Sequence, residues 1–599
     1  MRGRMSDLPK KWGTVKLDLN SAESSGPPEA RRQSVAPPWR PDHHSQAAGL
    51  AMLDAIAHAA QVEPLTRPAA EPAGDRTTAG DRDTAGRVSL AFRLCYGLFV
   101  VVGLAMAVAF GMFWFSPERL PRDFGPQADV ADIVLFGALT FVVWHRLLLD
   151  VCAWLMCLRV GSYRPAPDPQ PGLRVALITT FVPASESLDM LRNTLAGMIV
   201  ADYPHDTWVL DEGDDPEARA MCEHLGVRHF SRKGLDGFNT DGGTFAARTK
   251  GGNHNAWYAH HASRYDIVAQ VDSDFRVRRD FLTRTLGHFR DPYVAFVGTP
   301  QIYGNMGNLI ARGAAQQTYM FYGPILRALS SWRMTLLIGA NHIVRVAALR
   351  EVGWYQGHLV EDLATGKRFH LAGWKSIYVP EALAVGEGPT TWAAYFNQQY
   401  RWAFGCMSIF FTQQHITAKM DFIKGLTYFF LEQFYFAGVR VAVGTGLLIL
   451  YYLTGWTPAD LPLPEMLIWY VPLVCWRQVL SFMLQRLTVR PRLERGVYWA
   501  GNLVSIAVLP IYFLAFIGVI RGKRVSFKTT PKGDSDSEEL DKLSVFAPHL
   551  VLVALAAAGI GLGYVLGHRS LVFAGWGLLN IVIYVSFVFG LLWKRLARR

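Results

Sequence analysis

Two pairs of carboxylates have types and spacings that could do chemistry. Asp272 and Asp274 end the apolar run VAQVDSDF and stand two residues apart. Carboxylates at this spacing can share one divalent cation, and Mg²⁺ or Mn²⁺ prefers oxygen ligands, which a diphosphate can complete. In LVEDL, Asp362 is the candidate general base for a hydroxyl group, with Glu361 beside it. A solvated turn and an acidic pair at a helix N-terminus are the structural alternatives.

Three more motifs carry side chains that could bind a nucleoside, a phosphate or a sugar ring. The strand-like run VLDEGDD contains Asp211, whose carboxylate could accept hydrogen bonds from a nucleobase or a ribose. In TKGGNHN, Lys250 adds a positive charge beside two glycines that permit close backbone approach. In QQYRW, which begins at Gln398, Arg401 could hold a diphosphate and Trp402 could stack on a sugar. A turn, a plain loop and an amphipathic interfacial helix are the corresponding alternatives.

A further motif lies late in the chain. The sequence SFKTTPKG is followed by the polar stretch DSDSEELDK. Thr530 and Lys532 could close over a charged nucleotide. A basic loop on an anionic membrane surface would have a similar composition, so both interpretations stay open at this point.

Strands and helices in alternation must position these residues. Over 172–390, short β-like runs such as RVALITTFVP, YDIVAQVDSD and YVAFVGTPQ alternate with helical stretches. This alternation indicates an α/β domain with a mostly parallel sheet. Ligands of open α/β sheets bind at the carboxyl ends of the strands, where we expect Asp211 and Asp272.

The composition places this domain in a membrane protein. Of 599 residues, 51% are apolar and 18% are charged, against about 25% charged in ordinary soluble proteins. These values argue against a wholly soluble enzyme and against a disordered chain. The net charge of +11 suits a membrane protein, which retains Lys and Arg on its cytoplasmic side, and we expect no nucleic-acid partner. The six cysteines indicate neither a disulfide framework nor a zinc site.

Long apolar runs flank the α/β domain on both sides. In the second run, Arg146 and Asp150 lie four residues apart, so they should turn inward and pair. The expected organisation is a disordered tail (1–88), two transmembrane helices (89–160), the α/β domain (172–390), interfacial helices with QQYRW (391–424), two transmembrane helices (425–485), an interfacial or re-entrant segment (493–522), a loop (523–545) and two transmembrane helices (547–594).

Flanking charge decides the interpretation of the segment 493–522. It is long enough to span a bilayer, but Asn502 and Pro510 interrupt it, and the basic sequences RPRLERG and RGKR flank it. With six spans and this segment uncounted, the tail, the α/β domain and both basic flanks lie on one side, which is cytoplasmic by the positive-inside rule. We therefore expect a multi-pass protein of the inner or plasma membrane with a cytoplasmic α/β domain.

Taken in order, these motifs resemble those of the processive family-2 glycosyltransferases, the cellulose synthase-like group of bacterial β-glycan synthases. The resemblance covers residues 172–550. The FKTTPK stretch is similar to the F-x-V-T-x-K gating loop of that group, with Thr529 in place of the valine. The other matching positions are an acidic strand end, a lysine segment, a DxD pair, an ED pair and Q-x-x-R-W: Asp211, Lys250, Asp272, Asp274, Asp362, Gln398, Arg401 and Trp402.

The resemblance implies a GT-A (Rossmann-like) cytoplasmic domain embedded in an α-helical transmembrane bundle. The activity would be inverting, processive transfer from a UDP-sugar, UDP-glucose first, into a β-linked polysaccharide that crosses the bilayer. Asp362 would be the base beside Glu361, and Trp402 would stack on the acceptor sugar. Asp272 and Asp274 would bind Mg²⁺ or Mn²⁺. The implied nucleotide-sugar ligands are Asp211, Lys250, Asp272, Gln398, Arg401, Thr530 and Lys532.

The sequence departs from that group where donor and acceptor would meet. The base motif, TED in that group, reads VED here, with Val360 in place of the threonine. Cellulose synthases usually have FFCG before the acceptor site, and Ile338 replaces its cysteine. A glycine-rich stretch, GLDGFNTDGGTF, precedes Lys250. These departures put cellulose in doubt and leave curdlan-type β-1,3-glucan, mannan and amino-sugar polymers open.

Two other functions compete with a polymer synthase. The first is a non-processive glycosyltransferase that makes a membrane glycolipid, and the second is a transporter whose soluble domain senses a nucleotide. A polymer synthase could hand its product to an export partner in the cell envelope. No PilZ-like domain follows Trp593, so we expect no cyclic-di-GMP control within this chain.

Overall fold

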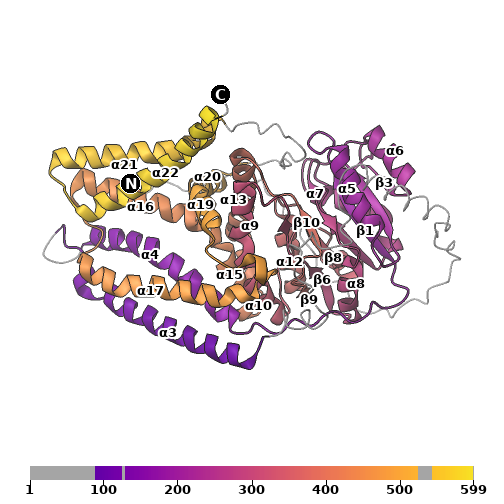
Figure 1. Cartoon of the computed structure of the whole chain (residues 1–599), viewed down its shortest axis with the longest axis horizontal. Coiled ribbons are helices and arrows are strands. Elements are labelled where there is room, and N and C mark those ends of the chain that lie inside the picture. The colour runs from indigo at the N-terminus through magenta and orange to yellow at the C-terminus, as the bar shows by residue number, and fades with distance from the viewer. Residues whose placement is uncertain (1–87, 125–128, 524–541, 598–599) are drawn as a thin grey trace, which may run out of the picture. The chain divides into compact units, whose positions relative to one another are not determined.

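The computed structural model describes residues 88–124, 129–523 and 542–597. All of them belong to one compact unit, Ile56–Arg599. Two sequence expectations fall outside the described residues: the disordered tail, except for Val88, and the loop that carries Thr530 and Lys532. The described chain comprises an α/β domain and a set of long helices (Figure 1).

A seven-stranded mixed sheet forms the centre of the α/β domain. The strands of the domain are β1 Val175–Phe181, β2 Asp206–Asp211, β3 Arg228–Phe230, β4 Ile267–Val271, β5 Arg276–Val277, β6 Val294–Gly298, β7 Ile302–Tyr303, β8 Asn341–Arg345, β9 Lys375–Tyr378 and β10 Ala384–Gly386. The large sheet has the order β3-β2-β1-β4-β8-β6-β9, and a smaller sheet has the order β5-β10-β7. Neighbours in the large sheet are parallel except β8, which is antiparallel to β4 and β6.

The reversed strand β8 brings an extra segment to the edge where ligands bind. Asn341, its first residue, pairs with Val271, the last residue of β4. The segment just before β8, which contains Gly339, therefore arrives at the carboxyl ends of the parallel strands. The mostly parallel sheet predicted over 172–390 is confirmed. The reversal of β8 is a pairing that the alternation of strands and helices does not encode.

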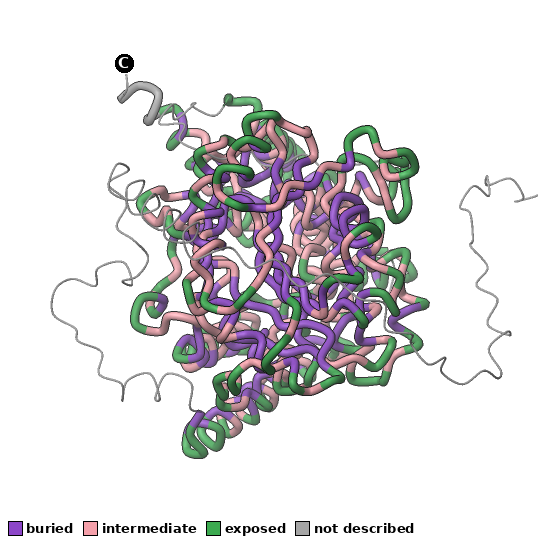
Figure 2. The backbone as a smooth tube through the Cα atoms, turned by 90° about the vertical axis from the view of Figure 1, so that its right-hand side faces the viewer, coloured by how far each residue is buried: buried purple, intermediate pink, exposed green. Residues whose placement is uncertain are grey.

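Helices cover both faces of the large sheet, so its strands are buried. Every residue of β4 and β6 is buried, and Figure 2 shows the buried parts of the chain gathered in the interior with exposed segments around them. Near-continuous apolar strands are typical of sheets covered on both faces. The helices of the domain are α5 Leu188–Ile199, α6 Pro216–Leu225, α7 Lys250–His261, α8 Phe281–Leu286, α9 Leu309–Met320, α10 Leu326–Ser331, α11 Val346–Glu351 and α12 Glu361–Leu371.

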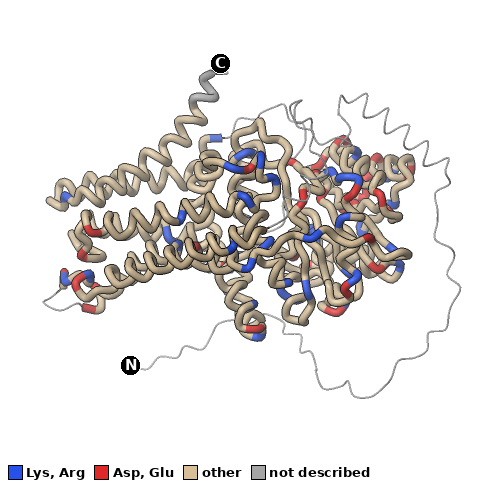
Figure 3. The backbone as a smooth tube through the Cα atoms, turned by 60° about the horizontal axis from the view of Figure 1, so that its bottom comes forward, with Lys and Arg blue, Asp and Glu red and all other residues tan. Residues whose placement is uncertain are grey.

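Seven helical segments of the described chain are long and apolar enough to cross a membrane. Six of them contain the long helices α3 Leu90–Trp114, α4 Val130–Cys157, α16 Ala437–Thr454, α17 Leu463–Leu484, α21 Ala547–Leu566 and α22 Leu571–Ala597. Contacts join α3 to α17, α4 to α16, α16 to α21 and α21 to α22. These helices carry few charges, whereas charges of both signs are dense over the α/β domain (Figure 3).

A charged group lies inside this set of helices. Arg146 and Asp150 of α4 form an ion pair at 3.0 Å, as the sequence predicts. Arg477 of α17 reaches the same carboxylate at 3.4 Å. Charged groups at membrane depth are costly unless they pair or face a cavity, so this cluster indicates an internal polar surface.

The seventh candidate, Trp499–Ile520, is the segment that the sequence predicts to be interfacial or re-entrant. It consists of two helices, α19 Trp499–Ala507 and α20 Leu509–Ile520. The first packs on α9 of the α/β domain, and the second packs on α16 and on α13 Trp392–Thr412. Its most apolar window is 44% buried inside the protein, compared with 17–28% in the other candidates. It satisfies the length and apolarity of a span, and its interfacial placement stays a prediction.

Shorter helices join the two parts of the chain. The helix α15 Phe422–Glu432 leads into α16 through a 3₁₀ turn, Phe434–Phe436. The helices α14 Gln414–Thr417 and α18 Pro491–Glu494 each form a single turn. A fully buried ion pair fixes α12 to α15: Lys367 Nζ donates to Glu432 Oε1 at 2.6 Å.

Candidate active site

One cavity of about 2030 Å³ opens at the carboxyl ends of β1, β2 and β4 and continues among the long helices. Most of the candidate site residues line it: Lys250, Asp272, Asp274, Glu361, Asp362, Gln398, Arg401 and Trp402. Side chains from three membrane helices line it as well: His145, Arg146, Asp150, Arg440 and Arg477. The structure therefore brings Lys250 of TKGGNHN and Trp402 of QQYRW to one cavity, although 152 positions separate them in the sequence.

Lys250 is the first residue of α7, so the segment predicted to be a loop is instead the first turn of a helix. Thr249 caps this helix, and its hydroxyl accepts a hydrogen bond from the Gly252 amide at 3.1 Å. A Cβ at Gly252 would lie 2.2 Å from the Ala246 carbonyl oxygen. This glycine is therefore required by the chain's own backbone.

The Lys250 ammonium group connects two sides of the site. It donates to the Asp272 carboxylate, and to the Gly339 carbonyl oxygen at 2.7 Å. Gln270 donates to the same carbonyl oxygen at 2.6 Å. Burial lowers the pKa of Lys250, but the negative charges of Asp272 and Glu361 outweigh this effect and raise the pKa above its ordinary value. Lys250 therefore stays charged and holds the segment before β8 against the end of β4.

Asp272 and Asp274 follow β4, and both line the cavity. Asp274 is only 6% exposed. Within the described residues, no group of three His, Cys, Asp or Glu side chains could hold a metal ion. Mg²⁺ is commonly bound by one or two carboxylates together with substrate phosphates, and these two residues fit that arrangement.

The acidic pair occupies the first turn of α12, the position that the structural alternative to a general base describes. The Asp362 carboxylate accepts a hydrogen bond from the Leu363 amide at 2.8 Å. Gly339 leaves room for this carboxylate, because a Cβ there would lie 3.1 Å from Asp362 Oδ2. The segment before β8 and the start of α12 thus meet at the Asp362 side chain.

Burial perturbs both acids of the pair. Desolvation, with the Asp362 charge next, raises the pKa of Glu361 to about 8. Desolvation also raises the pKa of Asp362 above its ordinary value, although the Leu363 amide and Lys250 favour its charged form. We infer that Glu361 is mostly protonated at neutral pH, and the role of Asp362 as the general base stays a prediction.

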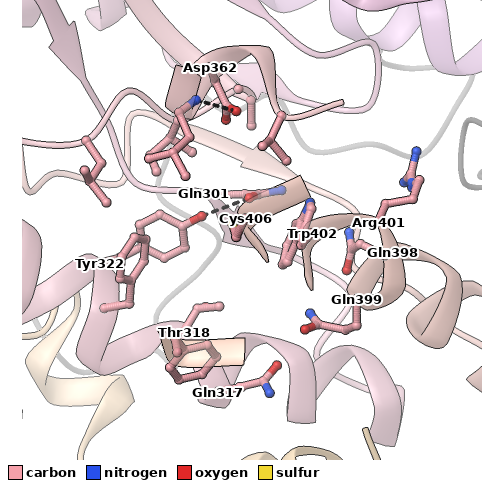
Figure 4. A pocket seen from close by; sticks show the side chains of 18 of the residues that line it. Gln301, Gln317, Thr318, Tyr322, Asp362, Gln398, Gln399, Arg401, Trp402 and Cys406 are labelled. Atoms are coloured by element: carbon pink, nitrogen blue, oxygen red, sulfur yellow. Dashed lines mark hydrogen bonds between the residues drawn. The ribbon is translucent and has the colours of Figure 1, made fainter. Parts of the chain in front are cut away.

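The helix α13 supplies the opposite wall of the site. A Cβ at Gly405 would lie 2.6 Å from Val360, so this glycine lets α13 approach the start of α12. Trp402 lies one turn earlier and projects into the cavity (Figure 4). Burial lowers the pKa of Arg401, and the charges of Glu361 and Asp272 oppose this shift. An arginine retains its positive charge under such conditions.

Among the predicted site residues that the structure describes, Asp211 is the one that does not line the cavity. It ends β2 and is fully buried. Its carboxylate accepts hydrogen bonds from the Gly213 amide at 2.8 Å and the Asp215 amide at 2.6 Å, and lies 3.1 Å from His229 Nε2. These contacts match the turn cluster that was the structural alternative. A contact between Asp211 and a nucleobase stays a prediction.

Sequence reasoning missed the buried Arg232. Its guanidinium forms two hydrogen bonds with the Glu212 carboxylate, at 2.9 and 2.6 Å. It also donates to the carbonyl oxygens of Phe238 and Ala246, at 3.1 and 3.0 Å, and so holds the glycine-rich stretch beside the cavity. In the sequence, Arg232 is a single arginine before a glycine-rich stretch, and this pattern does not indicate a buried structural role. Gln270 was detectable as a polar residue inside an apolar strand.

Part of the chain matches a known family of enzymes. The family model described as "Glycosyl transferase family group 2" matches residues 267–519. The UDP-forming cellulose synthase catalytic subunit of Pseudomonas fluorescens (strain SBW25) is 26% identical over 484 residues, which cover 78% of this chain and 61% of that protein. Cellulose synthase 1 of Komagataeibacter xylinus is 23% identical over 500 residues, which cover 79% of this chain and 30% of that protein.

Among solved structures, a Pyrobaculum calidifontis mannosyltransferase in complex with GDP-Man and Mn²⁺ aligns with a TM-score of 0.39 and 16% identity, over 61% of this chain and 99% of that one. The chain spans less than two thirds of the length of the two cellulose synthases that it matches. The match to the family model falls on the α/β domain from β4 onward and extends through α13, α16 and α17 to α20. Residues 267–519 thus match the family-2 glycosyltransferases, and most of the chain is similar to bacterial cellulose synthases.

Proposed function

We propose that this protein is an inverting, processive glycosyltransferase that polymerises a UDP-sugar, UDP-glucose first, into a β-linked polysaccharide and passes it across the membrane. The observation that carries the proposal is the continuous cavity. The same space is lined by Asp272 and Asp362 and by Arg440 and Arg477 of the membrane helices. A polymer made at the acidic residues could enter the helical part without leaving the protein.

In this proposal, Asp362 takes the proton from an acceptor hydroxyl group. The hydroxyl oxygen attacks the anomeric carbon of the donor opposite the diphosphate, which leaves with the bonding electrons. An α-linked donor then gives a β-linkage without a covalent enzyme intermediate. Arg401 and Lys250 favour the negative charge on the departing diphosphate, and Trp402 stacks on the acceptor sugar.

A divalent cation, Mg²⁺ or Mn²⁺, belongs to the proposal. Asp272 and Asp274, which both line the cavity, would be its protein ligands. When bound, the cation would neutralise charge on the diphosphate. The proposed location is the inner or plasma membrane, with the α/β domain and both basic flanks of 493–522 on the cytoplasmic side.

The test is UDP or GDP release by the purified full-length chain in nanodiscs. The donors are UDP-glucose, UDP-N-acetylglucosamine, UDP-galactose, UDP-glucuronate and GDP-mannose, each with Mg²⁺ or Mn²⁺. We expect release with one donor, its loss in EDTA, and a product of high molecular mass that one linkage-specific glycanase digests. Release that yields only a lipid-linked monosaccharide would overturn processivity. Nucleotide binding without release from any donor would overturn the transferase itself.

A small substitution next to the base should slow turnover without unfolding the protein. Gly339→Ala places a methyl group 3.1 Å from Asp362 Oδ2, so the carboxylate must shift by a few tenths of an ångström. We expect kcat to fall about tenfold, because misplacing a reacting group by 1 Å costs about a hundredfold. Gly307→Ala, where the new methyl group meets no atom within 4 Å, is the matched control. Equal kcat in the two variants would show that Asp362 does not need its present position.

A further inference from the structure

Tyrosine hydroxyl groups fix two glutamines that line the cavity. The Tyr322 hydroxyl donates to Gln301 Oε1 at 2.9 Å, and the Tyr512 hydroxyl donates to Gln399 Oε1 at 2.6 Å. Both tyrosines are buried, at 6% and 2% exposure. Tyr322 belongs to a π-helical turn, Phe321–Ile325, a rare conformation that is frequent at functional sites.

Two neighbouring glutamines of α9 are held in the same manner. The Gly501 amide donates to Gln316 Oε1 at 2.9 Å, and the Tyr395 hydroxyl donates to Gln317 Oε1 at 2.9 Å. Both glutamines line the cavity. Four amide oxygens, from the β6–β7 connection, α9 and α13, are therefore occupied by donors from the protein.

An occupied oxygen determines what each amide offers to a ligand. A glutamine side chain has one acceptor oxygen and two N–H donors. Within the described part of the chain, the Nε2 atoms of Gln301, Gln316 and Gln399 make no hydrogen bond. Since polar groups withdrawn from bulk water nearly always find partners, these N–H groups are available to acceptor oxygens inside the cavity.

The position of Gln399 along α13 shows how far the glutamines lie from the acidic pair. Gly405 packs on Val360, next to the acidic pair. Gln399 and Trp402 lie three residues apart and share a helix face. Gln399 is six residues before Gly405, which places it about 9 Å farther along the helix from the acidic pair. In Figure 4, Trp402 lies between Asp362 at the top and Gln399 below.

We propose that Gln301, Gln316 and Gln399 form a binding subsite for the growing glycan, beyond the sugar that Trp402 contacts. The ligand is an uncharged polyhydroxylated chain, whose hydroxyl, ring or bridging oxygens accept hydrogen bonds from the amide nitrogens. The glutamines themselves carry no charge. Buried tyrosines keep the amides of Gln301 and Gln399 in one orientation, and the Gly501 amide does so for Gln316. This subsite rests on the proposed function, because it concerns the acceptor of the same reaction.

The test compares binding of two neutral probes, cellotetraose and laminaritetraose, which differ in linkage. Gln399→Met and Gln301→Met remove the N–H donors while keeping an unbranched side chain. Tyr512→Phe keeps the Gln399 amide and removes the group that orients it. Each variant should raise the apparent KM for the better tetrasaccharide about fivefold, the effect of one hydrogen bond, and the Gln301→Met/Gln399→Met double variant about twentyfold. The KM for the sugar donor and the affinity for UDP should stay unchanged.

The controls separate the subsite from the proposed function. Gln170→Met makes the same change at an exposed position and should leave both KM values unchanged. An unchanged tetrasaccharide KM in the double variant would overturn the subsite, and so would an equal rise in the donor KM. If no donor is turned over by the unaltered protein, the proposed function fails. Tetrasaccharide binding by calorimetry, with and without Gln399→Met, then still tests the subsite.

Discussion

Asp362→Asn should lower kcat for UDP release about 10³-fold, while UDP binding stays within about twofold of that of the unaltered protein. The side chain keeps its size and its hydrogen bond with the Leu363 amide, but it can no longer take a proton. Burial raises the pKa of Asp362, so in the unaltered enzyme activity should fall on acidification at a pH above that at which an ordinary aspartate protonates. Steady-state UDP release over pH 4 to 9 and calorimetry with UDP measure the two effects.

Glu361→Gln is the control for this experiment. With a pKa of about 8, Glu361 is mostly protonated at pH 7, and an amide resembles that neutral form. We expect kcat at pH 7 within about threefold of that of the unaltered enzyme. Above pH 8 the unaltered enzyme gains a second negative charge beside Asp362, whereas the variant does not, so their profiles should diverge there. A variant as inactive as Asp362→Asn would move the role of base to Glu361.

Lys367→Met should produce the largest loss of stability. Lys367 is fully buried, and its partner Glu432 is 1% exposed. Breaking such a pair leaves a buried charge without compensation, which costs about 3–5 kcal/mol. We expect the apparent unfolding temperature in detergent to fall by about 6–20 °C. Circular dichroism during heating, at a fixed scan rate, measures the difference.

Two further variants show whether burial is the cause. Lys367→Met/Glu432→Met replaces the whole pair by apolar side chains and should recover most of the lost stability. Lys375→Met removes a partly exposed ion pair with Asp291, 3.0 Å long, and should cost less than about 1 kcal/mol. If Lys367→Met costs no more than Lys375→Met, then α12 is not fixed to α15 through this contact.

The sequence identifies the parts of the site that follow strongly patterned elements. Asp272 and Asp274 stand out because an apolar strand runs directly into them. Glu361 and Asp362 stand out as carboxylates that suit a general base, although acidic residues also favour the first turn of a helix. Their assembly with α13 depends on contacts such as Gly405 against Val360, which no local pattern encodes.

The features that the sequence analysis missed or misassigned have local physical causes. Two glycines made TKGGNHN look like a loop, but the Thr249 cap and tertiary packing make its second residue the start of α7. In the sequence, Gln316 and Gln399 look like ordinary polar positions of helices, and Gln301 like the polar end of a strand. Their significance depends on which atom of each amide is already bonded, and partners such as Tyr512 lie more than 100 residues away.

The charged cluster among the membrane helices also affects whether ions could leak through the cavity. Among the described residues, the lining of the helical part of the cavity includes Arg146, Arg440 and Arg477. Its acidic side chains are Asp150 and Glu432, and Glu432 is paired with Lys367. A passage wide enough for a sugar is wide enough for hydrated sodium ions and for chains of water that conduct protons. Fixed positive charge in surroundings of low dielectric repels such cations and does not oppose a neutral molecule. If the proposed function holds, a membrane that contains this protein would keep its ion gradients and its electrical potential while the glycan crosses it.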